Sequence, residues 1–258
     1  MNDFYDWDKH WSDFDESTQF NPAQQYRFKL ISDALHRFPA SRLVDIGCGQ
    51  GDLLRYVSRE FPMMELYGFE LSESGVESTR AKVPGAAVEV LDLLSEGASD
   101  RLVHVKADIA TCSEVLEHVP DPRRFLERAK LALRPGGTLI VTVPGGPRTA
   151  FDKAIGHIRH FDRASAGELL KDAGFDAVQV FGAGFPFFDL YKLAALARGE
   201  KVASDYQGDP SKVFSGAMRF FRTAFRFNLN NSPFGWQIVV TGERPKDEPG
   251  LDRRWEVN

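Results

Sequence analysis

The sequence has little of several features that would decide its class at once. Only two of its 258 residues are cysteines, too few for a disulfide framework, and no histidine–cysteine spacing suggests zinc. No apolar run is long enough to cross a membrane, and the acidic, aromatic N-terminus is unlike a signal or transit peptide. The formal net charge of −5 argues against broad nucleic-acid binding. These absences predict a cytoplasmic, globular protein with no metal, membrane span or nucleic-acid partner.

Short apolar runs alternate with amphipathic segments along most of the chain. The runs predict strands and the segments between them predict helices. Such alternation is typical of an α/β fold with a doubly wound, mostly parallel sheet, whose ligands bind beyond the carboxyl ends of the strands. The expected strands lie within residues 42–47, 64–71, 86–93, 102–113, 138–144, 176–182 and 236–244.

These elements divide the chain into five segments. Residues 1–40 are expected to form an N-terminal helix and lid, and residues 41–182 the ligand-binding core. Residues 183–234 are rich in phenylalanine and are expected to form a helical cap over the binding cleft. The last core strand, residues 235–244, and a polar tail, residues 245–258, follow. Packing in a homodimer, or a plain extension of the core, is the alternative use of the aromatic segment.

Three glycines, Gly47, Gly49 and Gly51, stand at alternate positions directly after the first expected strand. Glycine is needed where the backbone takes a positive φ or where another molecule comes close. Dinucleotide enzymes use the spacing G-x-G-x-x-G there, to place a pyrophosphate at a helix N-terminus. Here Asp45 precedes the loop, which disfavours a diphosphate and suits an ammonium group. Glu70 ends the next strand and can accept hydrogen bonds from ribose hydroxyls, so we expect a nucleoside with a cationic tail.

Four stretches, in this order, resemble motifs of the class I S-adenosylmethionine-dependent methyltransferases. They are VDIGCGQGDLL, GFELSESGVESTR, SEVLEHVPDPRRFLERAKLALRPGGTLIVTVP and GHIRHFDRASAGELLKDAGF. The last is similar to a segment of the small-molecule branch that includes ubiquinone-type O-methyltransferases. The resemblance covers about residues 43–182 and implies a Rossmann-like sheet of seven strands, the last antiparallel, with S-adenosylmethionine as cofactor.

The resemblance also assigns roles to single residues. It implies that Asp45 and the glycine loop face the methionine end of the cofactor and that Glu70 holds the ribose. Asp92 matches the acid that accepts the adenine amino group, whereas Asp108 starts a strand and so lies at the wrong end of the sheet. Glu114 is expected close to the methyl group. The full expected cofactor-binding set is Asp45, Gly47, Cys48, Gly49, Gly51, Glu70, Leu71, Asp92, Leu93, Glu114 and His118.

Several of these residues also have a purely structural interpretation. Asp45 could cap the following turn, and Glu70 could be a solvated strand end. Glu114 and Glu117 could be first-turn helix acids that the helix dipole favours, which is the preferred interpretation for Glu117. Cys48 is expected to be a packing residue, because nothing nearby would activate its thiol.

Methyl transfer from a sulfonium is an in-line displacement, for which the protein supplies alignment and a dry site. A hydroxyl acceptor also needs a base, and histidine suits this role at neutral pH. His157 and His160 lie in the loop after the fifth strand, which should face the acceptor. We expect one of them to be the catalytic base; hydrogen bonds that pin the loop are the alternative.

The predicted function is therefore O-methylation of a small molecule such as a sugar or secondary metabolite. N- or C-methylation of a small molecule, an RNA or peptide acceptor, and a binding module that keeps the nucleoside without catalysis remain as alternatives. The Asn/Asp-Pro-Pro-aromatic motif of nucleobase amino-methylating enzymes is missing after the fourth strand. A nicotinamide oxidoreductase is excluded, since its Tyr-x-x-x-Lys spacing occurs only at Tyr5–Lys9, before the first strand.

Overall fold

The computed structural model describes residues 7–8, 21–199 and 212–247 of the chain. Its strands are β1 (Arg42–Ile46), β2 (Glu65–Glu70), β3 (Ala87–Val90), β4 (Ala107–Ser113), β5 (Leu133–Pro144), β6 (Asp176–Ala183) and β7 (Gln237–Glu243). Its helices are α2 (Pro22–Leu35), α3 (Asp52–Glu60), α4 (Glu73–Lys82), α5 (Ala98–Leu102), α6 (Pro122–Ala129), α7 (Ala150–Ala154), α8 (Arg163–Asp172), α9 (Phe187–Arg198) and α11 (Lys212–Ala224). Two single 3₁₀ turns cover Lys130–Ala132 and Phe225–Phe227.

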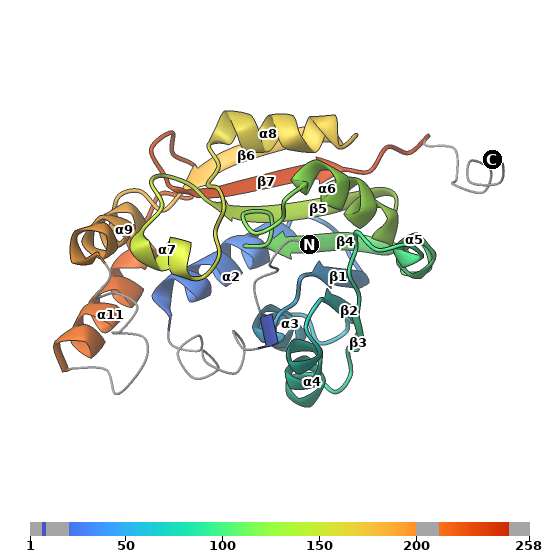
Figure 1. The fold of residues 1–258 in the computed structure, drawn as a ribbon, viewed down its shortest axis with the longest axis horizontal. Coiled ribbons are helices and arrows are strands. Elements are labelled where there is room, and N and C mark those ends of the chain that lie inside the picture. Colours follow the sequence, from blue (N-terminus) through green and yellow to red (C-terminus); the bar gives the residue numbers. More distant parts are fainter. Residues whose placement is uncertain (1–6, 9–20, 200–211, 248–258) are drawn as a thin grey trace.

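The strands form one seven-stranded sheet in the order β3-β2-β1-β4-β5-β7-β6 (Figure 1). Neighbouring strands are parallel from β3 to β5, and β7 is antiparallel to both β5 and β6. This confirms the expected doubly wound sheet with an antiparallel last strand. Because the parallel strands end at one edge, the loops after β1, β2, β4 and β5 lie around a common space.

Successive side chains of each strand point to opposite faces of the sheet, and they contribute to one hydrophobic layer on each face. In β1, Leu43 joins the layer under α2 and α3, whereas Val44 joins the layer under α6 and α8. Ile31 of α2 anchors the first layer, and Leu126 of α6 and Leu170 of α8 anchor the second. Helices therefore cover both faces of the sheet (Figure 1). The two hydrophobic layers hold the strands, and so their carboxyl ends, in place.

Two elements differ from the sequence expectation. The short helix α5 lies between the third and fourth expected strands and includes Leu102, the first residue of the range expected for the fourth strand; Ala98 and Leu102 are both buried in the core. The fifth strand begins at Leu133 instead of Thr138, and Leu133 pairs with Ala107 of β4. Both differences arise from tertiary packing that the local composition does not reveal.

The aromatic insertion between β6 and β7 contributes the helices α9 and α11. Its Phe225 is 5% exposed, and the ring centroid lies 5.6 Å from that of Tyr26, 5.7 Å from Phe188 and 5.8 Å from Tyr191. Some of the aromatic side chains of this insertion therefore pack against α2. That the insertion closes over the binding cleft as a cap stays a prediction.

Residues 1–6 and 9–20 of the predicted N-terminal segment and residues 248–258 of the predicted polar tail lie outside the described residues. Within the lid segment, Asp8 accepts hydrogen bonds from the Ser72 hydroxyl (2.5 Å) and the Ser74 backbone N–H (3.1 Å), at the N-terminus of α4. Among the described helices, none combines the length and the apolar character that crossing a bilayer requires.

Replacing Phe225 with alanine tests the packing of the insertion. We expect the free energy of unfolding to fall by about 3–5 kcal/mol, the range for removing a buried aromatic ring. Phe227, two residues on, is 70% exposed, so the matched variant Phe227→Ala should change stability by no more than about 0.5 kcal/mol. Urea denaturation measures both, and equal effects of the two variants would contradict this packing.

Candidate active site

A cavity of about 750 Å³ lies at the carboxyl ends of the strands. Residues after β1, β2, β4 and β5 form one wall, and Arg27 of α2 with Tyr191 and Lys192 of α9 line another part. Most of the predicted site residues line it, namely Asp45, Gly47, Cys48, Gly49, Glu70, Leu71, Asp92, Leu93, Glu114, His118 and His157. Gly51 and His160 are not among the lining residues.

The glycine loop needs its glycines for reasons of backbone geometry. Gly47, Gly49 and Gly51 have φ values of 76°, 53° and 78°, a region that other residues rarely adopt. A Cβ atom on Gly47 would lie 2.5 Å from Val115 Cγ2, and one on Gly51 would lie 2.6 Å from Thr79 Cγ2. The N–H of Gly47 also donates to the Phe69 carbonyl at 2.8 Å. The protein's own packing thus holds the loop as a tight bend against β2.

Glu70 ties this loop to the end of β2. Its Oε2 accepts a hydrogen bond from the Gly49 N–H at 2.8 Å, and its Oε1 accepts one from the Ser72 N–H at 3.1 Å. The residue is 6% exposed, so it is not a solvated strand end. A carboxylate has about four acceptor positions, so it can accept hydrogen bonds from several donors at once. Fixing the loop is a role that the sequence analysis did not predict, and ribose binding stays a prediction.

Asp45 is a buried carboxyl group beside the loop. It is 2% exposed, and its Oδ1 accepts a hydrogen bond from the Thr111 hydroxyl at 2.7 Å. Burial raises the pKa of Asp45 to about 7; the charge of Glu70 adds to this shift, and the Thr111 hydrogen bond opposes it. A nearby ammonium group would favour the ionised form and lower this pKa.

The acid predicted for the adenine end lies on the surface after β3. Oδ1 of Asp92 accepts a hydrogen bond from the Leu94 N–H at 2.8 Å; its contact with the adenine amino group stays a prediction. Asp108 instead accepts hydrogen bonds from the Ser41 and Arg42 N–H groups at 2.8 and 3.0 Å, next to the start of β1. It lies at the opposite edge of the sheet, as its sequence position indicates.

Glu114 begins the turn after β4 with a φ of 56°, an uncommon conformation for a residue with a side chain. Its Oε1 accepts hydrogen bonds from Gln237 Nε2 at 2.9 Å and from the Thr142 hydroxyl at 3.3 Å. Its Oε2 lies 3.7 Å from Arg27 Nη1. Gln237 and Arg27 were not predicted, because they come from β7 and α2, far from the motif that contains Glu114.

His157 and His160 form a hydrogen-bonded chain rather than two equivalent groups. His160 Nδ1 lies 2.9 Å from the Gly146 carbonyl oxygen, and His160 Nε2 lies 3.1 Å from His157 Nδ1. Burial lowers the pKa of both histidines, that of His157 to about 2, so both rings are neutral near pH 7. Because the Gly146 carbonyl can only accept, His160 Nδ1 carries a hydrogen and donates to it. His160 Nε2 is then an acceptor, so His157 Nδ1 donates to it. His157 Nε2 therefore carries the lone pair.

Glu117 is not the first-turn helix acid that the sequence analysis preferred. It lies in the turn between β4 and α6, is fully buried, and faces His157 with 3.9 Å between Oε1 and Nε2. Burial, with the charge of Glu114 adding to it, raises the pKa of Glu117 well above its usual range. The side chain is buried because Glu117 lies in this turn and not in the first turn of a helix, where it would be exposed.

Asp152 and Lys192, which the sequence analysis did not identify, line the cavity next to His160 and form a buried ion pair. Lys192 Nζ lies 3.0 Å from Asp152 Oδ2, and the same carboxylate caps α7 by accepting from the Thr149 N–H at 2.7 Å. Burial would raise the pKa of Asp152, but the Lys192 ammonium and the Thr149 hydrogen bond lower it overall. In the sequence, the capping-box pattern T-x-x-D that begins at Thr149 indicates the start of a helix and a capping role for Asp152.

The chain matches the family model of a methyltransferase domain over residues 23–180. The chain belongs to this family. This membership confirms the resemblance that the sequence showed. It also confirms S-adenosylmethionine as the cofactor. The fold of the chain is also similar to the solved structure of an S-adenosylmethionine-dependent methyltransferase of Thermotoga maritima. The TM-score is 0.57 at 20% identity, over 85% of this chain and 90% of the other.

Two curated methyltransferases are similar to about half of the chain. Trans-aconitate 2-methyltransferase of Variovorax paradoxus is 30% identical over 133 residues, which are 48% of this chain and 50% of the relative. Ubiquinone biosynthesis O-methyltransferase of Paraburkholderia phymatum is 33% identical over 129 residues, 48% of this chain and 54% of the relative. The chain thus spans about half the length of these relatives.

The pKa of Asp45 predicts how cofactor binding depends on pH. Below pH 7 the carboxyl group is protonated in the free protein, and an ammonium ligand must displace that proton. The affinity for S-adenosylhomocysteine should therefore rise about tenfold from pH 6 to pH 8, because about one proton is released on binding. Titration calorimetry measures this, and Asp45→Asn should bind with little pH dependence. A wild-type affinity that does not change over this range would contradict the assignment.

Proposed function

We propose that this methyltransferase transfers the methyl group of S-adenosylmethionine to a hydroxyl group of a small molecule. The position of His157 supports this proposal most strongly. Its ring lines the cavity, and its Nδ1 donates a hydrogen bond to His160. Its Nε2 lone pair can interact with the proton of an acceptor hydroxyl. The name of the O-methyltransferase relative is consistent with this chemistry.

The two halves of the cavity have different chemistry. One half carries the glycine loop, Asp45 and Glu70, and we assign it to the cofactor. The other half is lined by aromatic rings of Phe151, Phe188 and Tyr191. Such rings suit the apolar face of a sugar or the ring of a secondary metabolite, which are the acceptor classes that we propose.

The charged groups of the acceptor half are largely neutralised within the protein. Arg27 lies 3.7 Å from Glu114, and Lys192 lies 3.0 Å from Asp152. An acceptor that depends on strong negative charge, such as an RNA backbone, would have to compete with these carboxylates. This balance of charge supports a neutral or weakly charged small molecule over RNA.

In the reaction, the acceptor oxygen attacks the methyl carbon, the carbon–sulfur bond breaks, and its electron pair stays on sulfur. The hydroxyl proton must leave during or after this attack. We propose that its loss depends on His157 and that His160 acts as a positioning residue, since its ring links His157 Nδ1 to the Gly146 carbonyl. The two sequence hypotheses, a base and a loop-pinning residue, then describe two different histidines.

Screening hydroxylated metabolites with methyl-labelled S-adenosylmethionine identifies the acceptor, and mass spectrometry of the product locates the new methyl group. With that acceptor, His157→Ala should lower kcat by about 10²–10⁴-fold, the usual contribution of proton-transfer catalysis. Affinity for S-adenosylhomocysteine should stay within about twofold of the wild type, because His157 lies in the acceptor half. His104 is exposed on the loop before β4, so His104→Ala is the control with unchanged kcat. Full turnover by His157→Ala, or a product methylated on nitrogen or carbon, would refute the proposal.

A further inference from the structure

The side chain of Glu117 is the least satisfied acid in the described part of the chain. It is 0% exposed, and neither carboxylate oxygen has a hydrogen-bond partner among the described residues. A buried carboxylate normally requires a paired charge or hydrogen bonds. Burial alone therefore does not explain why an acid stands here, and a positively charged partner would.

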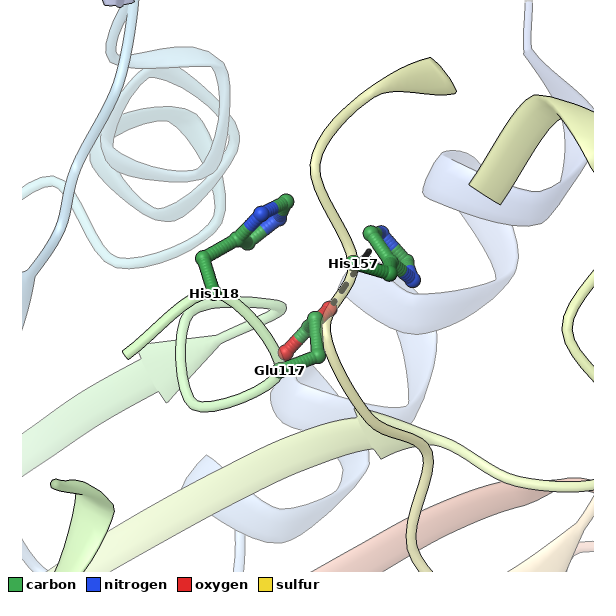
Figure 2. A group of neighbouring side chains, drawn as sticks. All are labelled: Glu117, His118 and His157. Atoms are coloured by element: carbon green, nitrogen blue, oxygen red, sulfur yellow. Dashed lines mark ion pairs between the residues drawn. The ribbon is translucent and has the colours of Figure 1, made fainter. Parts of the chain in front are cut away.

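Two imidazole rings lie next to this carboxylate. Glu117 and His118 come from the turn after β4, and His157 comes from the loop after α7 on the facing side (Figure 2). Glu117 Oε1 and His157 Nε2 are 3.9 Å apart, and one ligand atom from each of the three residues lies within 4.8 Å of the others. Three metal-binding groups thus converge although 39 positions separate His118 from His157 in the sequence (157 − 118).

The hydrogen bonds around His157 prepare one nitrogen for a cation. Its Nδ1 donates to His160, which is held by the Gly146 carbonyl. Nε2 therefore presents its lone pair on the side of Glu117. Histidines that bind metals commonly donate the other ring N–H in this way, which fixes the tautomer and the ring orientation.

We propose that Glu117, His118 and His157 bind a divalent transition-metal cation, with Zn²⁺ as the probe. Two imidazoles and one carboxylate are a typical ligand set of catalytic zinc sites, which keep a further position open. Ligand atoms around tetrahedral zinc are about 3.3 Å apart, so small side-chain rotations would close the present spacing. His118 and His157 both line the cavity, so the open position faces the acceptor half.

A neighbouring group is a poorer candidate for the same cation. Asp152 and His160 also lie near His157, with ligand atoms within 4.8 Å of one another. Lys192 and the Thr149 N–H already bind the Asp152 carboxylate, however, and the Gly146 carbonyl holds His160. The unsatisfied acid therefore selects the cluster of Glu117, His118 and His157.

The consequence for catalysis, unlike the cation site itself, rests on the proposed function. An acceptor hydroxyl at the open position would coordinate the cation through its oxygen, which lowers its pKa. The O–H bond breaks with its proton going to water, and the oxygen then attacks the methyl carbon as above. His157 promotes this step as a ligand of the cation.

Zinc binding can be measured without any acceptor. After dialysis against a chelator, the full chain is loaded with ZnCl₂, passed through a desalting column and analysed by elemental mass spectrometry, and calorimetry gives the affinity. We expect about one zinc per chain in the wild type and in the His104→Ala control. Glu117→Gln, which keeps the shape of the side chain, should weaken zinc binding by more than about a hundredfold, the upper range for loss of an outer-shell partner. His118→Ala gives a second test on a half-buried ring.

Thermal unfolding and S-adenosylhomocysteine affinity show whether each variant is folded. Co²⁺ in place of zinc should give the visible absorption bands of a four- or five-coordinate site in the wild type and lose them in Glu117→Gln. Equal zinc affinity in wild type and in a folded Glu117→Gln or His118→Ala would overturn the proposal, as would a folded wild type that binds no zinc. If His157→Ala lacks turnover while the wild type is active without bound metal, His157 is a direct base and the cation site is wrong, although the proposed function holds.

Discussion

The bend between β1 and α3 depends on one carboxylate, that of Glu70. By accepting the N–H groups of Gly49 and Ser72, it joins the loop after β1 to the loop after β2. The glycines allow the bend, and Val115 and Thr79 leave no space for larger residues at Gly47 and Gly51. This interaction sets the shape of the cofactor half, and the parallel strands bring the loop with Glu114 and His118 to the same edge of the sheet.

Local sequence patterns were sufficient to predict the sheet and to bring the glycine loop and Glu70 to one cavity. The glycine spacing, the acid that ends β2 and the alternation of apolar runs are short-range signals, and each is tied to a backbone requirement. The short helix α5 had no such signal, because its buried residues Ala98 and Leu102 stand among polar neighbours. The start of β5 at Leu133 depends on pairing with Ala107, which no local pattern contains.

The part of the cavity that we assign to the acceptor was harder to predict, because its residues come from distant segments. Glu117 looked like a solvated helix acid, yet the turn after β4 buries it against a histidine from beyond β5. Lys192 of the insertion reaches Asp152 of α7, and Gln237 of β7 reaches Glu114. Long-range contacts such as the one between Gln237 and Glu114 become visible only when the sheet order is known, since β7 inserts between β5 and β6.

The proposed reaction requires one orientation of the cofactor, with its ribose on Glu70 and its sulfur toward the histidine side of the cavity. A crystal structure of the complex with S-adenosylhomocysteine tests this most directly. We expect both ribose hydroxyls within hydrogen-bond distance of the Glu70 carboxylate, the ammonium group near Asp45 and the sulfur facing His157. A nucleoside bound in the opposite direction, or a Glu70 carboxylate with no ligand contact, would contradict the account.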